Sequence, residues 1–384
     1  MIFRILEDQY AQKSRESKAA DARFMQLALA LGRRGQGRTW PNPAVGAVIV
    51  KDGVIVGRGW TQPGGRPHAE PDALKRAGEA ARGATLYVTL EPCSHFGKSP
   101  PCVDAVIASG IARVVSAIED PNPEVAGQGH AKLRAAGIIV DVGLNAAEAA
   151  YDHAGHFRRI RDKRPHVILK LAVSADDKIG AAGRKPIAIT GEPARTRVHL
   201  LRAQCDAILV GIGTVLADDP VLTCRLPGME HLSPVRVVLD RSLRIPGTSR
   251  LVQTARETPL WVMTSDLAEA PAAMKLGAAG AQVIRVAASS TPPGLDLPAV
   301  LRALSDKGIS RLMVEGGARV ASSFVSAGLV DEVWLLRGPD TVGADGVPAL
   351  DALPLSALTG SPALRVRASE SVGEDTLTIY ERTA

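Results

Sequence analysis

The chain has 384 residues, of which 46% are hydrophobic and 22% charged, and it carries a formal net charge of +6. This length exceeds the size at which one hydrophobic core usually keeps growing, so we expect two domains. An aromatic content of 3%, beside many small aliphatic residues, favours α/β packing over a β-sandwich. No run of 18 or more apolar residues occurs, so no membrane partner is expected.

The N-terminal segment and the charge pattern narrow the class of protein. Residues 1–18 lack the apolar region and cleavage site of a signal peptide, which predicts a cytoplasmic protein. Four cysteines at unequal spacing then favour thiols or metal ligands over disulfides. The basic residues form no block and few aromatics are available to stack bases, so we expect no nucleic-acid partner. A phosphorylated small molecule suits the positive charge better.

The first domain is expected over residues 21–150, after an N-terminal extension of residues 1–20. Asp21 is a plausible N-cap for a helix that runs to about Arg34. Asp52-Gly53 between two apolar runs is a strong hairpin signal. The expected strands are 45–50, 54–57, 85–89, 112–118 and 138–142, and the expected helices are 68–77, 101–109 and 127–136. This alternation predicts a three-layer α/β domain.

A basic segment, residues 151–165, ends on a proline and is expected to be a connecting helix and linker. A second α/β domain is expected over residues 166–384. Its strands are predicted at 166–173, 207–210, 236–240, 260–264, 283–286, 311–315 and 332–336, and its helices near 192–204, 298–307 and 319–327.

Three side chains in the first domain are candidate zinc ligands. His68, Cys93 and Cys102 would supply three protein ligands and leave a fourth position open for water, as catalytic zinc requires. Glu70 lies near the first turn of a predicted helix and is not itself a ligand, so its carboxylate can face that water. A deaminase needs this arrangement, because the metal lowers the pKa of the water and the Glu carries a proton to the leaving amine.

The cysteine spacing leaves an alternative open. The deaminase signature is His-x-Glu followed by Pro-Cys-x-x-Cys, whereas eight residues separate Cys93 from Cys102 here. The longer loop carries His95 and Lys98, which are candidate substrate contacts. A closed structural zinc site with His95 as its fourth ligand is the alternative, although such sites usually show closely spaced cysteines and no free Glu beside them.

Two glycine turns mark the second domain, which has no Gly-x-Gly-x-x-Gly fingerprint. Residues 211–214 follow one predicted strand, and residues 315–317 end another just before a helix. Converging backbone N–H groups and a favourable helix dipole make such a place an anion site. A plain β-to-α turn is the alternative reading for either one.

Taken together, these motifs resemble the bifunctional riboflavin-biosynthesis pyrimidine deaminase/reductase family. The similar segments are His68-Ala69-Glu70, residues 92–102, Pro41-Asn42-Pro43, Asp120-Pro121-Asn122-Pro123, residues 207–220 and Val314-Glu315-Gly316-Gly317. The eight-residue loop between the cysteines is this family's own variant. The resemblance covers residues 20–380. It implies an N-terminal cytidine-deaminase-like domain and a C-terminal dihydrofolate-reductase-like domain.

The resemblance also implies chemistry and site residues. The first domain would deaminate a phosphorylated diamino-pyrimidinone with Zn²⁺, held by His68, Cys93 and Cys102, and with Glu70 as proton shuttle. The second would reduce the ribosyl chain with NADPH. Implied cofactor contacts are Ala172, Thr214, Asp218, Gly317, Ala318, Arg319, Val320, Ala321, Ser322 and Ser323. Implied substrate contacts are Asn42, His95, Lys98, Arg202, Leu222, Arg225 and Glu315.

Three of the residues in the second domain are candidates for specific roles in the reduction. Asp218 is a candidate for orienting or protonating the opening ribose, and an acid role would require a raised pKa. Arg202 and Arg225 suit phosphate because guanidinium binds it bidentately, with a solvated surface position as the alternative.

Departures from the family pattern keep rival functions open. Asp177 stands where the family often has Gly, and Pro186 and Ala188 stand where it often has Ser and Trp. A working deaminase with a degenerate reductase-like domain is therefore one rival. A nucleic-acid cytidine or adenosine deaminase and a zinc-stabilised binding protein are two more. We also expect a homo-oligomer.

Overall fold

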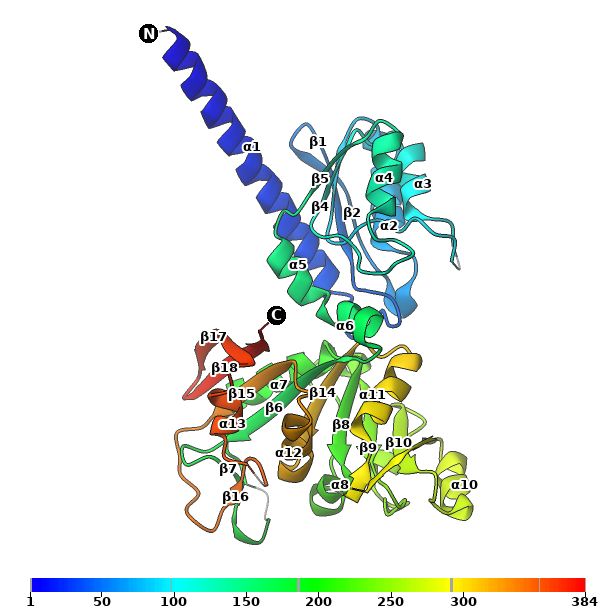
Figure 1. The fold of residues 1–384 in the computed structure, drawn as a ribbon, viewed down its shortest axis with the longest axis vertical. Helices are drawn as coiled ribbons and strands as arrows, with labels where there is room; N and C mark the ends of the chain where they lie inside the picture. Colours follow the sequence, from blue (N-terminus) through cyan, green and yellow to red (C-terminus); the bar gives the residue numbers. More distant parts are fainter. Residues whose placement is uncertain (1, 98, 185–186, 291–292, 352, 384) are drawn as a thin grey trace. The chain divides into compact units, whose positions relative to one another are not determined.

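The fold is taken from a computed structural model that describes residues 2–97, 99–184, 187–290, 293–351 and 353–383 (Figure 1). The chain divides into two compact units, Met1–Asp162 and Lys163–Ala384. The boundaries predicted from the sequence, 150 and 166, lie on either side of this division. No helix in the described part of the chain is long and apolar enough to cross a membrane.

The first unit is built on one five-stranded sheet with strand order β2-β1-β3-β4-β5. Strand β1 is antiparallel to β2 and β3, whereas β3, β4 and β5 run parallel. The strands are β1 (Gly46–Lys51), β2 (Val54–Trp60), β3 (Thr85–Val88), β4 (Arg113–Ser116) and β5 (Ile139–Val142). The helices are α1 (Ile2–Arg33), α2 (Ala69–Ala77), α3 (Cys102–Ala108), α4 (Gln128–Ala135), α5 (Ala146–Asp152) and α6 (Ala154–Asp162).

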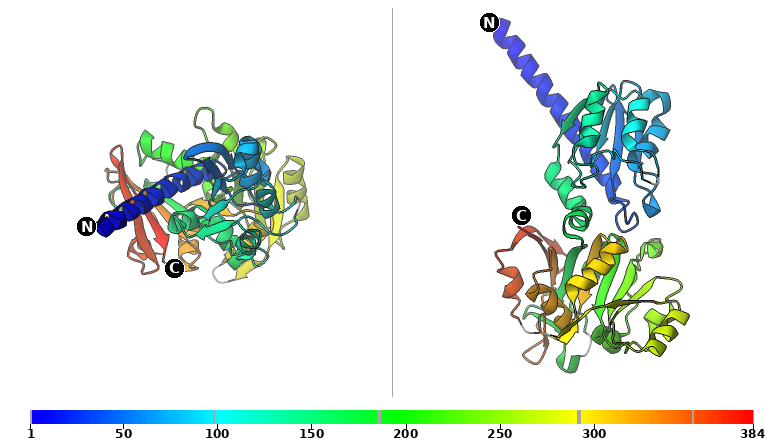
Figure 2. Two further views of the ribbon diagram at one scale, coloured as in Figure 1. Left: turned by 90° about the horizontal axis from the view of Figure 1, so that it is seen from above. Right: turned by 45° about the vertical axis from the view of Figure 1, so that its right-hand side comes forward.

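Strand alternation gives this sheet a core on each face. On β1, Ala47 and Ile49 face one core, to which α2, α3 and α4 contribute. Val48 and Val50 face the other, to which α1 and α5 contribute. Successive side chains of a strand point to opposite faces, so a strand that is apolar at every position needs helices on both sides. Figures 1 and 2 show these three layers, which confirms the predicted cytidine-deaminase-like architecture.

The helix expected to begin at Asp21 instead begins at Ile2. Asp21 is not an N-cap, because its carboxylate is engaged by side chains of the sheet. It accepts hydrogen bonds from the Tyr87 hydroxyl at 2.5 Å and from the Arg113 guanidinium at 3.1 and 2.8 Å. Residues 2–20, predicted to be an extension, therefore continue the same helix.

The second unit holds a nine-stranded sheet with order β11-β10-β9-β8-β14-β6-β15-β18-β17. The seven strands from β11 to β15 are parallel, and all were expected from the sequence. The strands are β6 (His166–Val173), β8 (Ala207–Gly211), β9 (Val235–Leu239), β10 (Leu260–Ser265), β11 (Gln282–Val286), β14 (Arg311–Gly316), β15 (Glu332–Arg337), β17 (Leu364–Val372) and β18 (Asp375–Arg382). The hairpin of β17 and β18 was not predicted.

Helices pack on this sheet, and two small two-stranded ribbons are separate from it. The helices are α7 (Glu192–Ala203), α8 (Ile212–Asp218), α9 (Arg250–Gln253), α10 (Ala270–Ala278), α11 (Leu297–Asp306), α12 (Ala318–Ser326) and α13 (Ser356–Thr359). The ribbons pair β7 (Lys178–Gly180) with β16 (Val347–Pro348) and β12 (Ala288–Ser290) with β13 (Pro293–Leu295). Figure 1 shows α8 and α12 at the carboxyl ends of the parallel strands.

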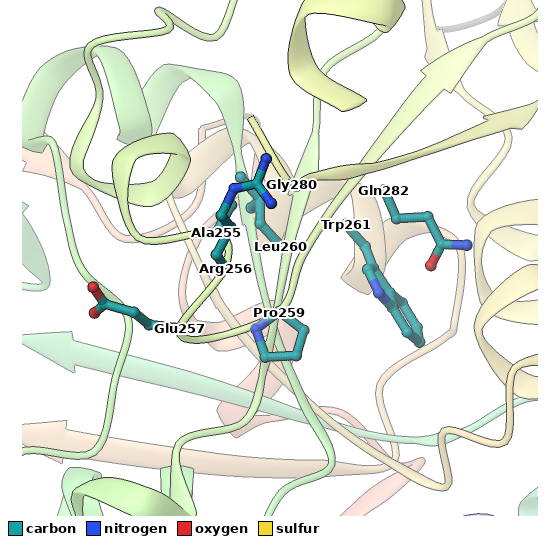
Figure 3. A pocket seen from close by; sticks show the side chains of 8 residues that line it. All are labelled: Ala255, Arg256, Glu257, Pro259, Leu260, Trp261, Gly280 and Gln282. Atoms are coloured by element: carbon teal, nitrogen blue, oxygen red, sulfur yellow. The ribbon is translucent and has the colours of Figure 1, made fainter. Parts of the chain in front are cut away.

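A pocket of about 430 Å³ lies at the other end of this sheet, where β10 and β11 begin (Figure 3). Its lining residues are Ala255, Arg256, Glu257, Pro259, Leu260, Trp261, Gly280 and Gln282. None of them is a predicted site residue. Ligands of open α/β sheets bind at the carboxyl ends of the strands, so this pocket is not the candidate site.

The contact between α1 and β1 generates a stability prediction. A Cβ at Gly46 would lie 1.9 Å from the Ala28 carbonyl oxygen, and backbone atoms of both elements would have to separate. Gly46→Ala should therefore lower the free energy of unfolding by about 3 kcal/mol. Gly277→Ala is the matched control, because Gly277 lies in α10 with open space around it; there alanine should stabilise by about 0.5–1 kcal/mol. Calorimetric unfolding checks both, and equal stability of the two variants would contradict the packing argument.

Candidate functional site

The three predicted metal ligands converge from the segments that follow β2 and β3, which end at the same edge of the sheet on either side of β1. Cys93 follows β3, Cys102 is the first residue of α3, and His68 immediately precedes α2. The His68 Nδ1 atom lies 3.3 Å from Cys102 Sγ and 3.7 Å from Cys93 Sγ. The backbone N–H of Cys102 also donates to Cys93 Sγ at 3.3 Å.

This donor set fits a zinc ion. One ligand atom from each of the three residues lies within 4.8 Å of the others, as ligands around one ion must. The hydrogen bond from the Cys102 thiol lowers the pKa of Cys93 to about 4, with His68 adding to the effect, so a thiolate is available at neutral pH. His95 is not a fourth member of this group among the described residues, so the geometry favours the open site over the closed structural one.

Glu70 lies beside this cluster on the first turn of α2. Its side chain is buried, with the residue 3% exposed. Burial raises the pKa of Glu70 to about 7, and the negative charge of Cys93 adds to the rise. A carboxyl group with a pKa near the working pH can both take and return a proton, which is the property that general acid–base catalysis requires.

A second buried carboxylate, Glu91, organises the loops around the cluster. Its oxygens accept the backbone N–H groups of Asp120 at 3.2 Å, Gly127 at 3.0 Å and His130 at 3.1 Å. Glu91 lies two residues before Cys93, so these bonds attach the segment after β4 to the cysteine loop. Glu91, Glu119 and His130 also form a group of metal-binding type, but the backbone bonds already occupy the Glu91 carboxylate.

Two of the three predicted substrate contacts of this unit are half-buried. Asn42 is half-buried, and its Nδ2 donates to the Gly65 carbonyl at 2.7 Å. His95 is half-buried in the cysteine loop, and no described residue bonds its buried Nδ1. Lys98 lies outside the described residues.

In the second unit, three predicted substrate contacts gather near the carboxyl end of β14. Glu315 accepts Arg202 Nη2 at 2.7 Å and Arg202 Nε at 3.2 Å. Lys170 of β6, which no sequence motif marks, lies 3.4 Å from the same carboxylate. Burial acts to raise the pKa of Glu315, but the two cations outweigh it and the pKa is lowered. Arg225 is exposed nearby, where partial desolvation lowers its pKa and the positive charge of Arg202 adds to the effect.

Leu222 and Asp218 differ in which of their atoms are accessible to a ligand. The Leu222 side chain belongs to the hydrophobic core, with the residue 4% exposed, so its backbone is the part that can contact a substrate. Asp218 is exposed at the end of α8, and partial burial raises its pKa. The direction of this shift is the one that an acid role needs.

The two glycine turns come together as a cradle. Thr214 Oγ1 of α8 donates to the Gly316 carbonyl at 3.3 Å. A Cβ at Gly317 would lie 3.0 Å from Thr214 Oγ1, and Gly317 has φ +79, so both space and backbone favour glycine. The free N–H groups of α12 begin here. Ala321 and Ser322 are buried, whereas Gly317 and Arg319 are exposed. Ala172 is the penultimate residue of β6, the strand beside β14 in the parallel sheet.

The departures from the family pattern are accommodated locally. Asp177 adopts φ +64, a conformation that favours glycine, and its carboxylate pairs with Arg337 at 2.7 Å. Ala188 is exposed, and Pro186 lies outside the described residues.

Comparison with known proteins agrees with this geometry. Residues 18–118 match the family model of the cytidine and deoxycytidylate deaminase zinc-binding region, and residues 165–378 match that of the RibD C-terminal domain. The riboflavin biosynthesis protein RibD of Aquifex aeolicus is 42% identical over 94% of this chain and 98% of its own length. That of Escherichia coli is 42% identical over 92% and 97%.

Solved structures extend the likeness to the fold. Acinetobacter baumannii RibD aligns with a TM-score of 0.83 at 34% identity, covering 96% of this chain and 100% of its own. A deaminase/reductase of Thermotoga maritima aligns with a TM-score of 0.82 at 35% identity and the same coverage. The fold and the two sites thus define a zinc-dependent deaminase joined to a reductase.

The chain belongs to the RibD family. It is a bifunctional enzyme of riboflavin biosynthesis with Zn²⁺ and NADPH as cofactors, which confirms the class predicted from the sequence.

Removing one sulfur should remove the metal. Cys102→Ser replaces a soft thiolate ligand by a hydroxyl, and we expect the zinc content of the purified protein to fall from about one ion per chain to well under half. Cys224→Ser is the control, because Cys224 is a buried thiol of the second unit; its zinc content should not change. Metal analysis by atomic emission decides, and full zinc in Cys102→Ser would exclude this residue as a ligand.

Proposed function

We propose that the first unit hydrolytically deaminates 2,5-diamino-6-(5-phosphoribosylamino)pyrimidin-4-one and that the second reduces the ribosyl side chain of the product to ribityl. The observation that carries the proposal is the buried Glu70 carboxyl, with its pKa of about 7, beside the His68, Cys93 and Cys102 cluster. The Thermotoga maritima relative, named as a diaminohydroxyphosphoribosylaminopyrimidine deaminase and 5-amino-6-(5-phosphoribosylamino)uracil reductase, supports the choice of substrate.

In the deaminase, His68, Cys93 and Cys102 would hold the zinc ion, which supplies a water of lowered pKa when bound. Glu70 takes a proton from the attacking water and delivers it to the departing amine. Its burial keeps the shuttled proton away from bulk solvent. The loops that carry Asn42, His95 and Lys98 would contact the pyrimidine and its ribose phosphate.

In the reductase, NADPH supplies the hydride when bound. The first N–H groups of α12, at the start of the segment from Gly317 to Ser323, would bind its diphosphate, with Ala172, Thr214 and Asp218 beside it. Arg225 would bind the substrate phosphate, and Arg202 would orient Glu315 toward the ribose while contributing positive charge. Asp218 would orient or protonate the opening ribose oxygen.

A small phosphorylated pyrimidine is the substrate class that suits both sites. We propose no nucleic-acid partner. The cytoplasmic location and the homo-oligomeric state expected from the sequence stay predictions.

The two half-reactions can be measured separately. Purified enzyme given the diamino-pyrimidinone should release ammonia without NADPH, and should oxidise NADPH only after deamination has supplied the reductase substrate. Ammonia release that is never followed by NADPH oxidation would leave a deaminase with a degenerate reductase-like domain. Absence of both would contradict the proposed substrate.

Glu70→Gln removes the proton shuttle and keeps the side-chain volume. We expect ammonia release to slow by about 10²–10⁴-fold with zinc content unchanged, while reduction of separately supplied deaminated substrate continues at the wild-type rate. Glu79→Gln, the same change at an exposed position after α2, is the control and should be silent. Deamination at the wild-type rate by Glu70→Gln would refute the shuttle role.

A further inference from the structure

The segment from His153 to Arg159, at the start of α6, contacts three loops of the deaminase unit. His153 contacts Thr89, which follows β3. His156 contacts Asp120, which lies beyond β4. Arg159 donates to the Pro41 carbonyl, next to Asn42. Nothing in the roles assigned above uses these contacts.

The contact between His156 and Asp120 is buried on both sides. His156 Nε2 lies 3.0 Å from Oδ1 and 3.2 Å from Oδ2 of Asp120, and both residues are less than 9% exposed. Burial acts to raise the pKa of Asp120, but the hydrogen bond and charge of His156 lower it, so the carboxylate is ionised at neutral pH. A buried ionised carboxylate requires such a partner.

Asp120 fixes a turn. Its Oδ1 accepts the backbone N–H of Asn122 at 2.8 Å, which is an Asx turn, while its own N–H donates to Glu91. The turn is therefore held from one side by Glu91, which precedes the cysteine loop, and from the other by His156. Removing His156 would leave the Glu91 contact and take away the second support.

The turn lies against the loop that carries Cys93. Ser94 Oγ donates to the Glu124 carbonyl at 3.4 Å, and Lys132 Nζ donates to the Ser94 carbonyl at 2.7 Å. Glu124 is tied back to the turn, because its N–H donates to Asn122 Oδ1 at 3.2 Å, so the turn and the loop that carries Cys93 lie side by side next to the metal ligands. The Glu91 contacts, which help to place Cys93, do not involve His156 and remain when His156 is replaced.

His153 supports the neighbouring loop. Its Nε2 lies 3.1 Å from Thr89 Oγ1 and 3.2 Å from the Thr89 carbonyl oxygen, and Thr89 Oγ1 accepts the Gly46 N–H at 3.1 Å. Burial lowers the pKa of His153 to about 4, with the His156 charge adding to the effect, so His153 is neutral at pH 7. The two histidines therefore bond to the segments that follow the adjacent strands β3 and β4.

We propose that His156 is a positioning residue of the deaminase, which holds the Asp120–Asn122 turn where it contacts the substrate. The inference rests on the proposed deaminase function. It assigns to α6, the last helix of the first unit, a part in substrate binding as well as in joining the two units of the chain.

Steady-state deamination by the full-length zinc enzyme tests this proposal. His156→Ala should raise KM for the diamino-pyrimidinone about tenfold and change kcat by less than about threefold, because the catalytic groups stay in place. Zinc content and NADPH-dependent reduction of separately supplied deaminated substrate should equal those of the wild type. His156→Gln retains an N–H donor and should recover most of the loss in KM.

Arg158→Ala is the matched control on the same helix. Arg158 pairs with Asp162 at 2.6 Å near the surface, so its loss should leave KM unchanged. If His156→Ala does not fold, His156→Asn, whose shorter side chain does not reach Asp120, should raise KM in the same way.

Two results would overturn the proposal. A lower melting temperature with unchanged KM would make His156 a purely structural residue. A fall in kcat together with zinc loss would place its effect on the metal site. Wild-type enzyme that fails to deaminate the compound would instead refute the proposed function, so the two failures are distinguishable.

Discussion

The carboxylate of Glu91 is the contact on which the deaminase site depends. A buried carboxylate without donors would be strongly destabilising, and three backbone N–H groups satisfy this one. Those groups belong to the segment after β4, whereas Glu91 itself follows β3. The contact therefore sets the distance between the loops of two neighbouring strands, and Cys93, two residues further on, is placed by it.

The candidate site of the reductase unit also lies at the carboxyl ends of parallel strands, but its charged side chains are mostly positive. Glu315 lies between Lys170 and Arg202, so the cations outnumber the carboxylate by one, and Arg225 adds a further positive charge. This excess suits a phosphorylated substrate. In the proposed cofactor site, backbone N–H groups above the glycine cradle bind the diphosphate and need no charged side chain. A substrate phosphate and a cofactor diphosphate would then not compete for the same arginines.

Local sequence patterns predicted the features that are set by residues close together in the chain. Apolar runs between Gly or Asp-Gly turns predicted the seven parallel strands of the second unit and the alternating strands and helices of the first. A compact motif predicted the metal ligands. The hairpin of β17 and β18 was missed because it contains no continuous apolar run at β17, where Leu364, Val366 and Ala368 only alternate with polar residues and most of the strand is exposed. The start of α1 was misplaced because Asp21 bonds to residues 66 and 92 positions away. The pairing of Arg202 with Glu315, and the contacts of His153 and His156, likewise join distant segments, so no local pattern could reveal them.

The location of α6 affects how such an enzyme can be divided. A cut at residue 150, where the apolar pattern of the first domain ends, would give a deaminase that retains every metal ligand and Glu70 yet lacks both histidines. The hydrogen bonds of Thr89 and Asp120 to the helix would then be replaced by water. A separate deaminase made from this chain would need to continue through Asp162, and gene fission or domain exchange within the family would be constrained to the few residues between that point and β6.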